Sequence, residues 1–299
     1  MERRDYNRGR ACGKVAAVMQ ILSLQSRVAY GHVGNSTDVP VLQHLGHPVW
    51  PVDTTLLSNH LGYATYGGRI LPAAEVAAVV EGLAKLDLFG RVDALLSGFL
   101  GQSADVAGEA VARLRNQNPA ALYCLDPVMG ERDGGLYVAA ATAETIARRL
   151  VPQADMLLPN AFELDYLAGG RTRKLADVMS AAQSLRARAR PGAIVIATGI
   201  GREDGPAGRV EALALGDGGG WLASVPWLDP PTHGAGDLFT ALFLGHYLNR
   251  RDLPWALGKA MDATHAVFIR SAGQQELALV ASLDHLTDAP KIVKIEKIG

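Results

Sequence analysis

The sequence alternates between short runs of Val, Ile and Leu and longer segments with helical apolar spacing. The strand-like runs are 20–24, 48–54, 93–99, 121–126, 154–158 and 193–198, and the helical segments are 39–45 (beginning near Pro40), 72–88, 104–116, 142–150, 162–167 and 175–189. Buried strands that are separated by helices form parallel sheets covered on both faces. The alternation therefore predicts an α/β fold: a three-layer sandwich with a mostly parallel central sheet.

The later part of the chain changes this pattern. Strand-like runs at 210–215 and 220–225 are joined through Asp217-Gly218-Gly219, which predicts a hairpin and an antiparallel edge of the sheet. Segments 253–272 and 275–286 have helical spacing and are expected to close the domain. Residues 1–18 are basic and polar at the start, so we expect an N-terminal extension there and a single domain over 19–299.

Composition narrows the class of partner. The chain has 299 residues, 20% of them charged, and a formal net charge of −1, which argues against nucleic acid and membrane surfaces as partners. A small molecule is expected instead. The chain has two cysteines, Cys12 and Cys124, and no apolar run near the roughly 20 residues that span a bilayer, which favours the cytoplasm.

The stretch Thr232-His233-Gly234-Ala235-Gly236-Asp237 precedes a helix that is apolar on all sides. A helix N-terminus presents free N–H groups to an anion, and the small residues 234–236 let a phosphate approach the backbone. Asp237 would repel a phosphate unless a metal offsets its charge or it takes a proton from an attacking hydroxyl. The alternative is a Gly-rich turn in which Asp237 only caps the helix.

Several predicted strands end at polar residues. These are Ser26, Asp126, Asn160 and Thr198, with Asp237 after the last strand. The carboxyl ends of parallel strands share one edge of the sheet, where ligands bind in doubly wound folds. Asp126 and Glu163 could hold Mg²⁺ there, although Asp126-Pro127 also suits a turn and Glu163 suits a first helical turn. The common nucleotide fingerprints are missing, and Thr198-Gly199-Ile200-Gly201 lacks the helix that a dinucleotide site needs.

Six blocks stand in order along the chain: Gln25-Ser26-x-Val28-x-Tyr30-Gly31-His32-Val33-Gly34-Asn35, Ser58-Asn59-His60, Ser97-Gly98-Phe99, Asp126-Pro127-Val128-Met129-Gly130, Pro159-Asn160-x-Phe162-Glu163 and Gly234-Ala235-Gly236-Asp237. Together they closely resemble the pyridoxal kinases of the ribokinase superfamily. The resemblance implies a ribokinase-like domain that uses ATP to phosphorylate the 5′-hydroxymethyl group of pyridoxal, pyridoxine or pyridoxamine. It also implies Mg²⁺, often K⁺, and a homodimer.

The resemblance assigns roles residue by residue. Asp237 matches the catalytic base, and Gly234, Ala235 and Gly236 match the anion hole. The nucleotide-binding positions are Asp126, Leu158, Asn160, Glu163 and Thr198, with Asp126 and Glu163 also as metal candidates. The substrate-binding positions are Ser26, His60, Leu61, Phe99, Tyr137 and Asp237. The glycine-containing region 126–137 is the candidate lid.

Four positions depart from the family pattern. Arg27 stands where His is usual, Leu61 and Leu158 where Thr is frequent, and Phe99 where Tyr is common. Phe99 can still stack on a pyridine ring, whereas Leu61 has no hydroxyl to offer. These changes bear on vitamer preference rather than on the reaction. A hydroxymethylpyrimidine kinase of thiamine synthesis and a non-catalytic pyridoxal-binding protein are the alternative functions.

Overall fold

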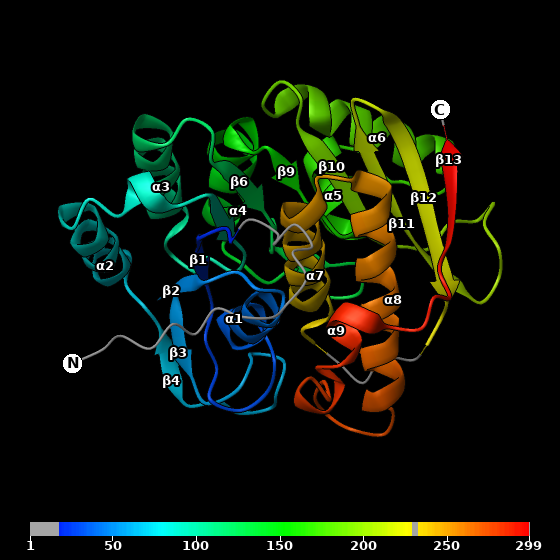
Figure 1. Cartoon of the computed structure of the whole chain (residues 1–299), viewed down its shortest axis with the longest axis horizontal. Helices are drawn as coiled ribbons and strands as arrows, with labels where there is room; N and C mark the ends of the chain where they lie inside the picture. The colour runs from blue at the N-terminus through cyan, green and yellow to red at the C-terminus, as the bar shows by residue number, and fades with distance from the viewer. Residues whose placement is uncertain (1–17, 229–232, 299) are drawn as a thin grey trace, which may run out of the picture.

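The computed structural model describes residues 18–228 and 233–298, and in this part of the chain one sheet of nine strands organises the fold (Figure 1). In sheet order the strands are β13 (Lys294–Ile298), β12 (Gly219–Pro226), β11 (Arg209–Gly216), β10 (Ile194–Ile200), β9 (Met156–Leu157), β6 (Leu122–Leu125), β5 (Ala94–Ser97), β1 (Ile21–Gln25) and β2 (Val49–Asp53). The strands from β10 to β2 pair in parallel, and β11, β12 and β13 pair antiparallel. The predicted mostly parallel sheet with an antiparallel edge is confirmed.

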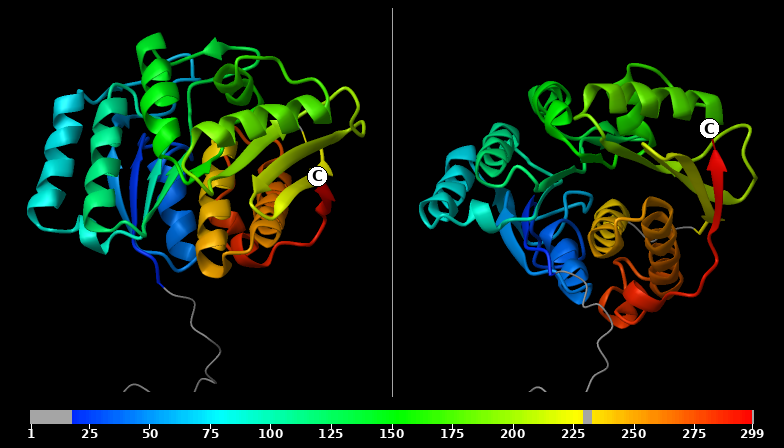
Figure 2. Two further views of the ribbon diagram at one scale, coloured as in Figure 1. Left: turned by 90° about the horizontal axis from the view of Figure 1, so that it is seen from above. Right: turned by 45° about the horizontal axis from the view of Figure 1, so that its top comes forward.

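Helices cover both faces of this sheet, as Figure 2 shows from two directions. One face carries α1 (Asn35–His44), α7 (Ala235–Arg250), α8 (Leu253–Ser271) and α9 (His285–Asp288). The other carries α2 (Ala73–Lys85), α3 (Ala104–Gln117), α4 (Ala140–Thr145), α5 (Ala161–Ala168) and α6 (Leu175–Arg188). Short 3₁₀ or π turns lie at Phe89–Arg91, Ile146–Leu150, Val151–Gln153 and Val280–Ser282. Each face has its own hydrophobic core, so the sandwich has three layers.

The N-terminus of helix α7 lies at the carboxyl edge of the sheet. The helix lies beside α1 and α8, and its residues from Leu238 to Leu244 are all buried (Figure 1). This explains why its sequence is apolar on all sides, because a helix enclosed between a sheet and two helices has no solvent face. Two small antiparallel pairs lie at the same edge: β3 (Thr55–Leu57) with β4 (Gly68–Ile70), and β7 (Gly130–Glu131) with β8 (Gly135–Leu136).

The predicted start of the first helix near Pro40 is wrong. Helix α1 begins at Asn35 and continues through Pro40. Asn35 is buried and bonded on two sides: its side-chain oxygen accepts from Ser23 Oγ at 2.7 Å, and its amide donates to Asp53 Oδ1 at 2.8 Å. These long-range contacts, rather than the local effect of proline, fix the first turn.

The predicted helix over 275–286 is also largely wrong. Only Val280–Ser282 and His285–Asp288 are helical, and the chain then forms β13, which pairs with β12 at the sheet edge. Ser271 Oγ accepts from Ala278 N at 2.8 Å, so a side chain takes a backbone donor that a helix would have used. Tertiary contacts thus override the helical spacing.

Two further expectations concern residues that the structure does not describe. Positions 1–17 of the predicted extension and Thr232 of the glycine-rich stretch lie outside them. Within the described residues, no helix is both long enough and apolar enough to cross a membrane.

Candidate active site

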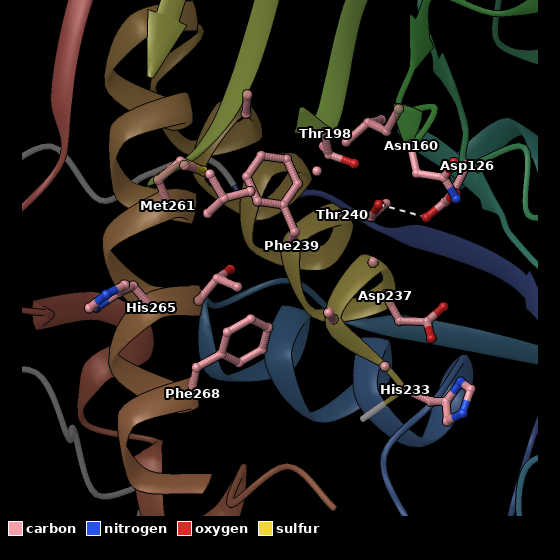
Figure 3. A pocket seen from close by; sticks show the side chains of 18 of the residues that line it. Asp126, Asn160, Thr198, His233, Asp237, Phe239, Thr240, Met261, His265 and Phe268 are labelled. Carbon is pink, nitrogen blue, oxygen red and sulfur yellow. Dashed lines mark hydrogen bonds between the residues drawn. The ribbon is translucent and has the colours of Figure 1, made fainter. Parts of the chain in front are cut away.

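A cavity of about 620 Å³ opens at the carboxyl ends of β6, β9 and β10, beside the first turn of α7 (Figure 3). The predicted catalytic and nucleotide-binding residues all line it: Asp126, Leu158, Asn160, Glu163, Thr198, Gly234, Ala235, Gly236 and Asp237. Tyr137, predicted on the acceptor side, lines it as well. Residues that are more than a hundred positions apart in the chain therefore meet in one place, as the parallel sheet requires.

Gly234 makes the turn into α7. Its φ is +91°, a left-handed conformation that favours glycine, and a Cβ at this position would overlap the carbonyl oxygen of His32. Asp237 lies in the first turn of the helix, and among the described residues no side chain caps this N-terminus. The first N–H groups of α7 are therefore available at the cavity, and the interpretation of Asp237 as a helix cap finds no hydrogen bond to support it.

Asp126 and Asp237 form the acidic centre of the cavity. Asp126 is 5% exposed and accepts a hydrogen bond from Thr240 Oγ1 at 2.7 Å, drawn as a dashed line in Figure 3. Burial and the nearby charge of Asp237 raise the pKa of Asp126 to about 8, against the lowering effect of Thr240. Burial likewise raises the pKa of Asp237, and the Gly34 backbone N–H partly offsets this. Both groups therefore hold protons more strongly than exposed carboxyls do.

Asn160 and Glu163 form a capping box at the start of α5. The Asn160 side chain accepts from the backbone N–H groups of Phe162 and Glu163, and Glu163 Oε2 accepts from Asn160 N at 2.8 Å. The other carboxylate oxygen of Glu163 accepts from Met129 N at 3.0 Å, while burial, followed by the charge of Asp126, raises its pKa well above the ordinary value. Asn160 also bridges to Thr198 on the neighbouring strand, which brings two predicted nucleotide contacts side by side.

The charge of the cavity suits a cation. Asp126, Glu131, Glu163, Glu211 and Asp237 line it; Glu211 is paired with Arg202, and among the described residues neither Lys nor Arg lines the cavity. Nowhere in the described part of the chain do three or more His, Cys, Asp or Glu side chains form a group that could hold a metal by itself. Mg²⁺ in phosphoryl-transfer sites is commonly held by one or two carboxylates together with phosphate and water, so this donor set fits that ion.

The other predicted substrate residues, Ser26, His60, Leu61 and Phe99, do not line this cavity. Ser26 is buried at the end of β1, where its carbonyl accepts from Asn35 N at 2.8 Å, and it lies against Gly34. The His60 ring packs against the ring of His233, with centroids 4.3 Å apart and the planes tilted by 47°. Leu61 is exposed, and Phe99 is half-buried after β5.

Several site residues escaped the sequence interpretation. Asp38 on α1 is fully buried, accepts from the Gln25 side chain, and has a pKa raised well above the ordinary value by burial and then by the charges of Asp237 and Asp126. Glu276 contacts both loops that hold the predicted acceptor residues. The apolar wall of the cavity is formed by Phe239, Met261 and Phe268 of α7 and α8, as Figure 3 shows. In the sequence, Asp38 looks like any helix residue, and Phe239, Met261 and Phe268 look like ordinary core residues. No local pattern therefore marked these residues as part of a site.

Comparisons with known proteins agree with this geometry. The phosphomethylpyrimidine kinase family model matches residues 63–278. A pyridoxal kinase, PdxY, of Corynebacterium diphtheriae is 39% identical over 290 residues, covering 94% of this chain and 100% of its own, and PdxY of Rubrobacter xylanophilus is 40% identical, covering 94% and 98%. The chain belongs to the pyridoxal kinase family.

A solved structure supports the same placement. The pyridoxal kinase of Leishmania donovani, determined in complex with ADP and pyridoxamine, superposes with a TM-score of 0.87 at 26% identity and covers 94% of this chain and 99% of its own. The agreement extends over nearly the whole length of both chains, so the two proteins share the same overall fold.

Proposed function

We propose that this chain transfers the γ-phosphoryl group of ATP to the 5′-hydroxymethyl group of pyridoxal, with pyridoxine and pyridoxamine as related acceptors. The observation that carries the proposal is the convergence of the Gly234-Ala235-Gly236-Asp237 helix start with Asp126, Asn160, Glu163 and Thr198 in one cavity. The chain that carries this site is about 40% identical to pyridoxal kinases along nearly its full length.

Asp237 is the proposed base. Phosphoryl transfer depends on in-line positioning and on charge stabilisation. The free N–H groups of residues 234–236 at the helix N-terminus supply the charge stabilisation. Burial raises the pKa of Asp237, which makes its ionised form a better proton acceptor for the attacking alcohol. The apolar wall of Phe239, Met261 and Phe268 suits the adenine ring of ATP at the other side of the cavity.

Asp126 and Glu163 are the proposed holders of Mg²⁺, directly or through water. When bound, the ion neutralises phosphate charge and keeps the triphosphate in line. Hydrogen bonds hold both carboxylates in place for this role. Thr240 orients Asp126, and the backbone N–H groups of Met129 and Asn160 orient Glu163. The resemblance also supports K⁺ as an activator.

On the acceptor side, Ser26, His60, Leu61, Phe99 and Tyr137 are the proposed contacts. Ser26 lies against Gly34, whose N–H points to Asp237, so the ring-binding residue and the base are joined through one glycine. Leu61 offers no hydroxyl, and a missing contact to a buried polar group costs about 1–3 kcal/mol. We therefore expect vitamer preference to differ from that of relatives with Thr there.

The domain and assembly also belong to this proposal. Residues 19–299 would form one ribokinase-like kinase domain, with residues 1–18 as an extension that takes no part in turnover. The resemblance supports a homodimer, and the two cysteines of the chain suit the reducing cytoplasm. Light scattering of the full chain and of a variant lacking residues 1–17 tests both: the expected mass is that of two chains in each case, with equal turnover.

The decisive test is product detection by mass spectrometry. The full chain is incubated with Mg-ATP and, separately, with pyridoxal, pyridoxine, pyridoxamine and hydroxymethylpyrimidine, each beside the Asp237→Asn variant. We expect a phosphorylated B6 vitamer from the native chain and a loss of turnover of roughly 10²–10⁴ in the variant, with pyridoxal binding retained. Turnover of the pyrimidine alone would indicate a thiamine-pathway kinase, and binding without turnover would indicate a pyridoxal-binding protein.

A further inference from the structure

Glu276 joins segments that are more than two hundred positions away in the sequence. Its Oε1 accepts a hydrogen bond from Tyr63 Oη at 2.6 Å and lies 3.3 Å from His60 Nε2. Its Oε2 accepts from His32 N at 3.2 Å. The Glu276 side chain is only 11% exposed, so its charge has little access to water and depends on these donors.

The surroundings leave this carboxylate little freedom. Gly31 has a φ of +96°, and a Cβ there would lie 2.5 Å from Glu276 Oε2, so the glycine allows the carboxylate to reach the His32 backbone. Gly62 N donates to His60 Nδ1 at 3.2 Å, which fixes the tautomer: the His60 proton is on Nε2, the atom that faces Glu276. The geometry therefore specifies an acceptor at both oxygens of residue 276.

The same cluster reaches the start of α7. The His60 ring packs in a tilted orientation against the ring of His233, which immediately precedes Gly234. The carbonyl of His32 lies against Gly234, and a Cβ on Gly234 would lie 3.2 Å from Leu277, the residue after Glu276. The two loops and the turn into the proposed anion hole are thus held together at one point.

We infer that Glu276 is a positioning residue that holds the 26–34 and 58–63 loops against the Gly234 turn in the arrangement that binds the acceptor alcohol. This rests on the proposed function, because the two loops carry the proposed acceptor contacts. Glu276 acts through His60, Tyr63 and the His32 backbone. It lies outside the lining of the nucleotide cavity, so it should affect acceptor binding separately from nucleotide binding.

Glu276→Gln is the informative substitution. An amide has one acceptor oxygen, so its NH₂ group must face either the His32 N–H or the Tyr63 O–H, and one of these donors loses its partner. We expect the dissociation constant for pyridoxal, measured by isothermal titration calorimetry without ATP, to rise about 10–100-fold. The dissociation constant for ADP should stay within about twofold, and Glu276→Asp, which keeps the charge, should recover part of the pyridoxal affinity.

The matched control is Asp155→Asn. Asp155 is also a largely buried carboxylate that accepts a backbone N–H, from Tyr123 at 2.6 Å, but it precedes β9 at the opposite end of the sheet. We expect this variant to melt at a lower temperature with both dissociation constants unchanged. Equal weakening of pyridoxal and ADP in Glu276→Gln, or no weakening of either, would overturn the inference.

Tyr63→Phe covers the case in which Glu276→Gln does not fold, because it removes only the 2.6 Å hydrogen bond from a partly exposed tyrosine. A smaller rise in the pyridoxal dissociation constant is expected, and an unchanged value would refute the positioning role. Both measurements use binding rather than turnover. A native chain that binds pyridoxal but phosphorylates no vitamer would therefore defeat the proposed function while leaving the role of Glu276 testable.

Discussion

Asp126 is expected to make the ligand-free protein less stable as the pH rises. In the unfolded chain this carboxyl ionises near its ordinary pKa of 3.8, whereas in the folded chain burial and Asp237 raise the pKa to about 8. Between these values the folded state binds one more proton than the unfolded state. The free energy of unfolding therefore falls by about 1.4 kcal/mol per pH unit from this group and levels off above pH 8.

Asp126→Asn should remove this slope. The amide keeps an oxygen that can accept from Thr240 and carries no charge, so the variant gains stability relative to the native chain by about 2–3 kcal/mol between pH 5.5 and pH 7.5. The effect on neighbours has the same sign, because the charge of Asp126 also raises the pKa of Glu163. For a chain of this size the difference corresponds to a relative shift in melting temperature of about 3–5 °C.

The assay is urea unfolding at several pH values in buffer free of Mg²⁺ and nucleotide. Asp262→Asn is the control, because Asp262 is a buried carboxylate that accepts from two backbone N–H groups, Ile292 and Val293, each at 2.8 Å. That variant should lose stability at every pH. Parallel pH profiles for the native chain and Asp126→Asn would refute the claim that this acid is destabilised by its site.

Three further outcomes are expected. Chelation with EDTA should abolish turnover, and added Mg²⁺ should restore it, as followed by ADP release. Gly234→Ala should lower turnover at least tenfold in a steady-state assay, because the φ of +91° at Gly234 and the nearby His32 carbonyl both oppose a Cβ. The control is Gly169→Ala, where φ is +75° and a Cβ would point into open space, and it should leave turnover unchanged. Hydrogen exchange should show the 126–137 region, which contains the β7–β8 hairpin, gaining protection when Mg-ATP binds.

The layout of the sheet could be predicted because each strand carries its own signal. Runs such as 193–197 are apolar over their length, and Asp217-Gly218-Gly219 encodes a local turn, so neither depends on distant residues. Parallel pairing then places the residues after each strand at one edge. Asp126, Asn160 and Thr198 could accordingly be assigned to one site without knowledge of their distances.

The acceptor side could not be worked out in the same way. The positions of Glu276 and Asp38 depend on how α8 and α1 pack against the sheet, and neither residue stands in a recognisable motif. The C-terminal strand β13 was missed for a related reason. Its alternation of Lys and Glu with Ile suits an edge strand or a polar tail equally well, and only pairing with β12 decides between them.

The acids at this edge show what the site is built to bind. Asp126 and Glu163 both have pKa values raised mainly by burial, and no Lys or Arg of the described residues lines the cavity to offset them. Such a set destabilises the folded chain unless protons or a cation neutralise it. A divalent ion that arrives with ATP would displace those protons, so the carboxylates reach their ionised form when the phosphates are present to share the metal. If the proposed function holds, the complex that the reaction requires would thereby relieve the electrostatic strain of the ligand-free protein.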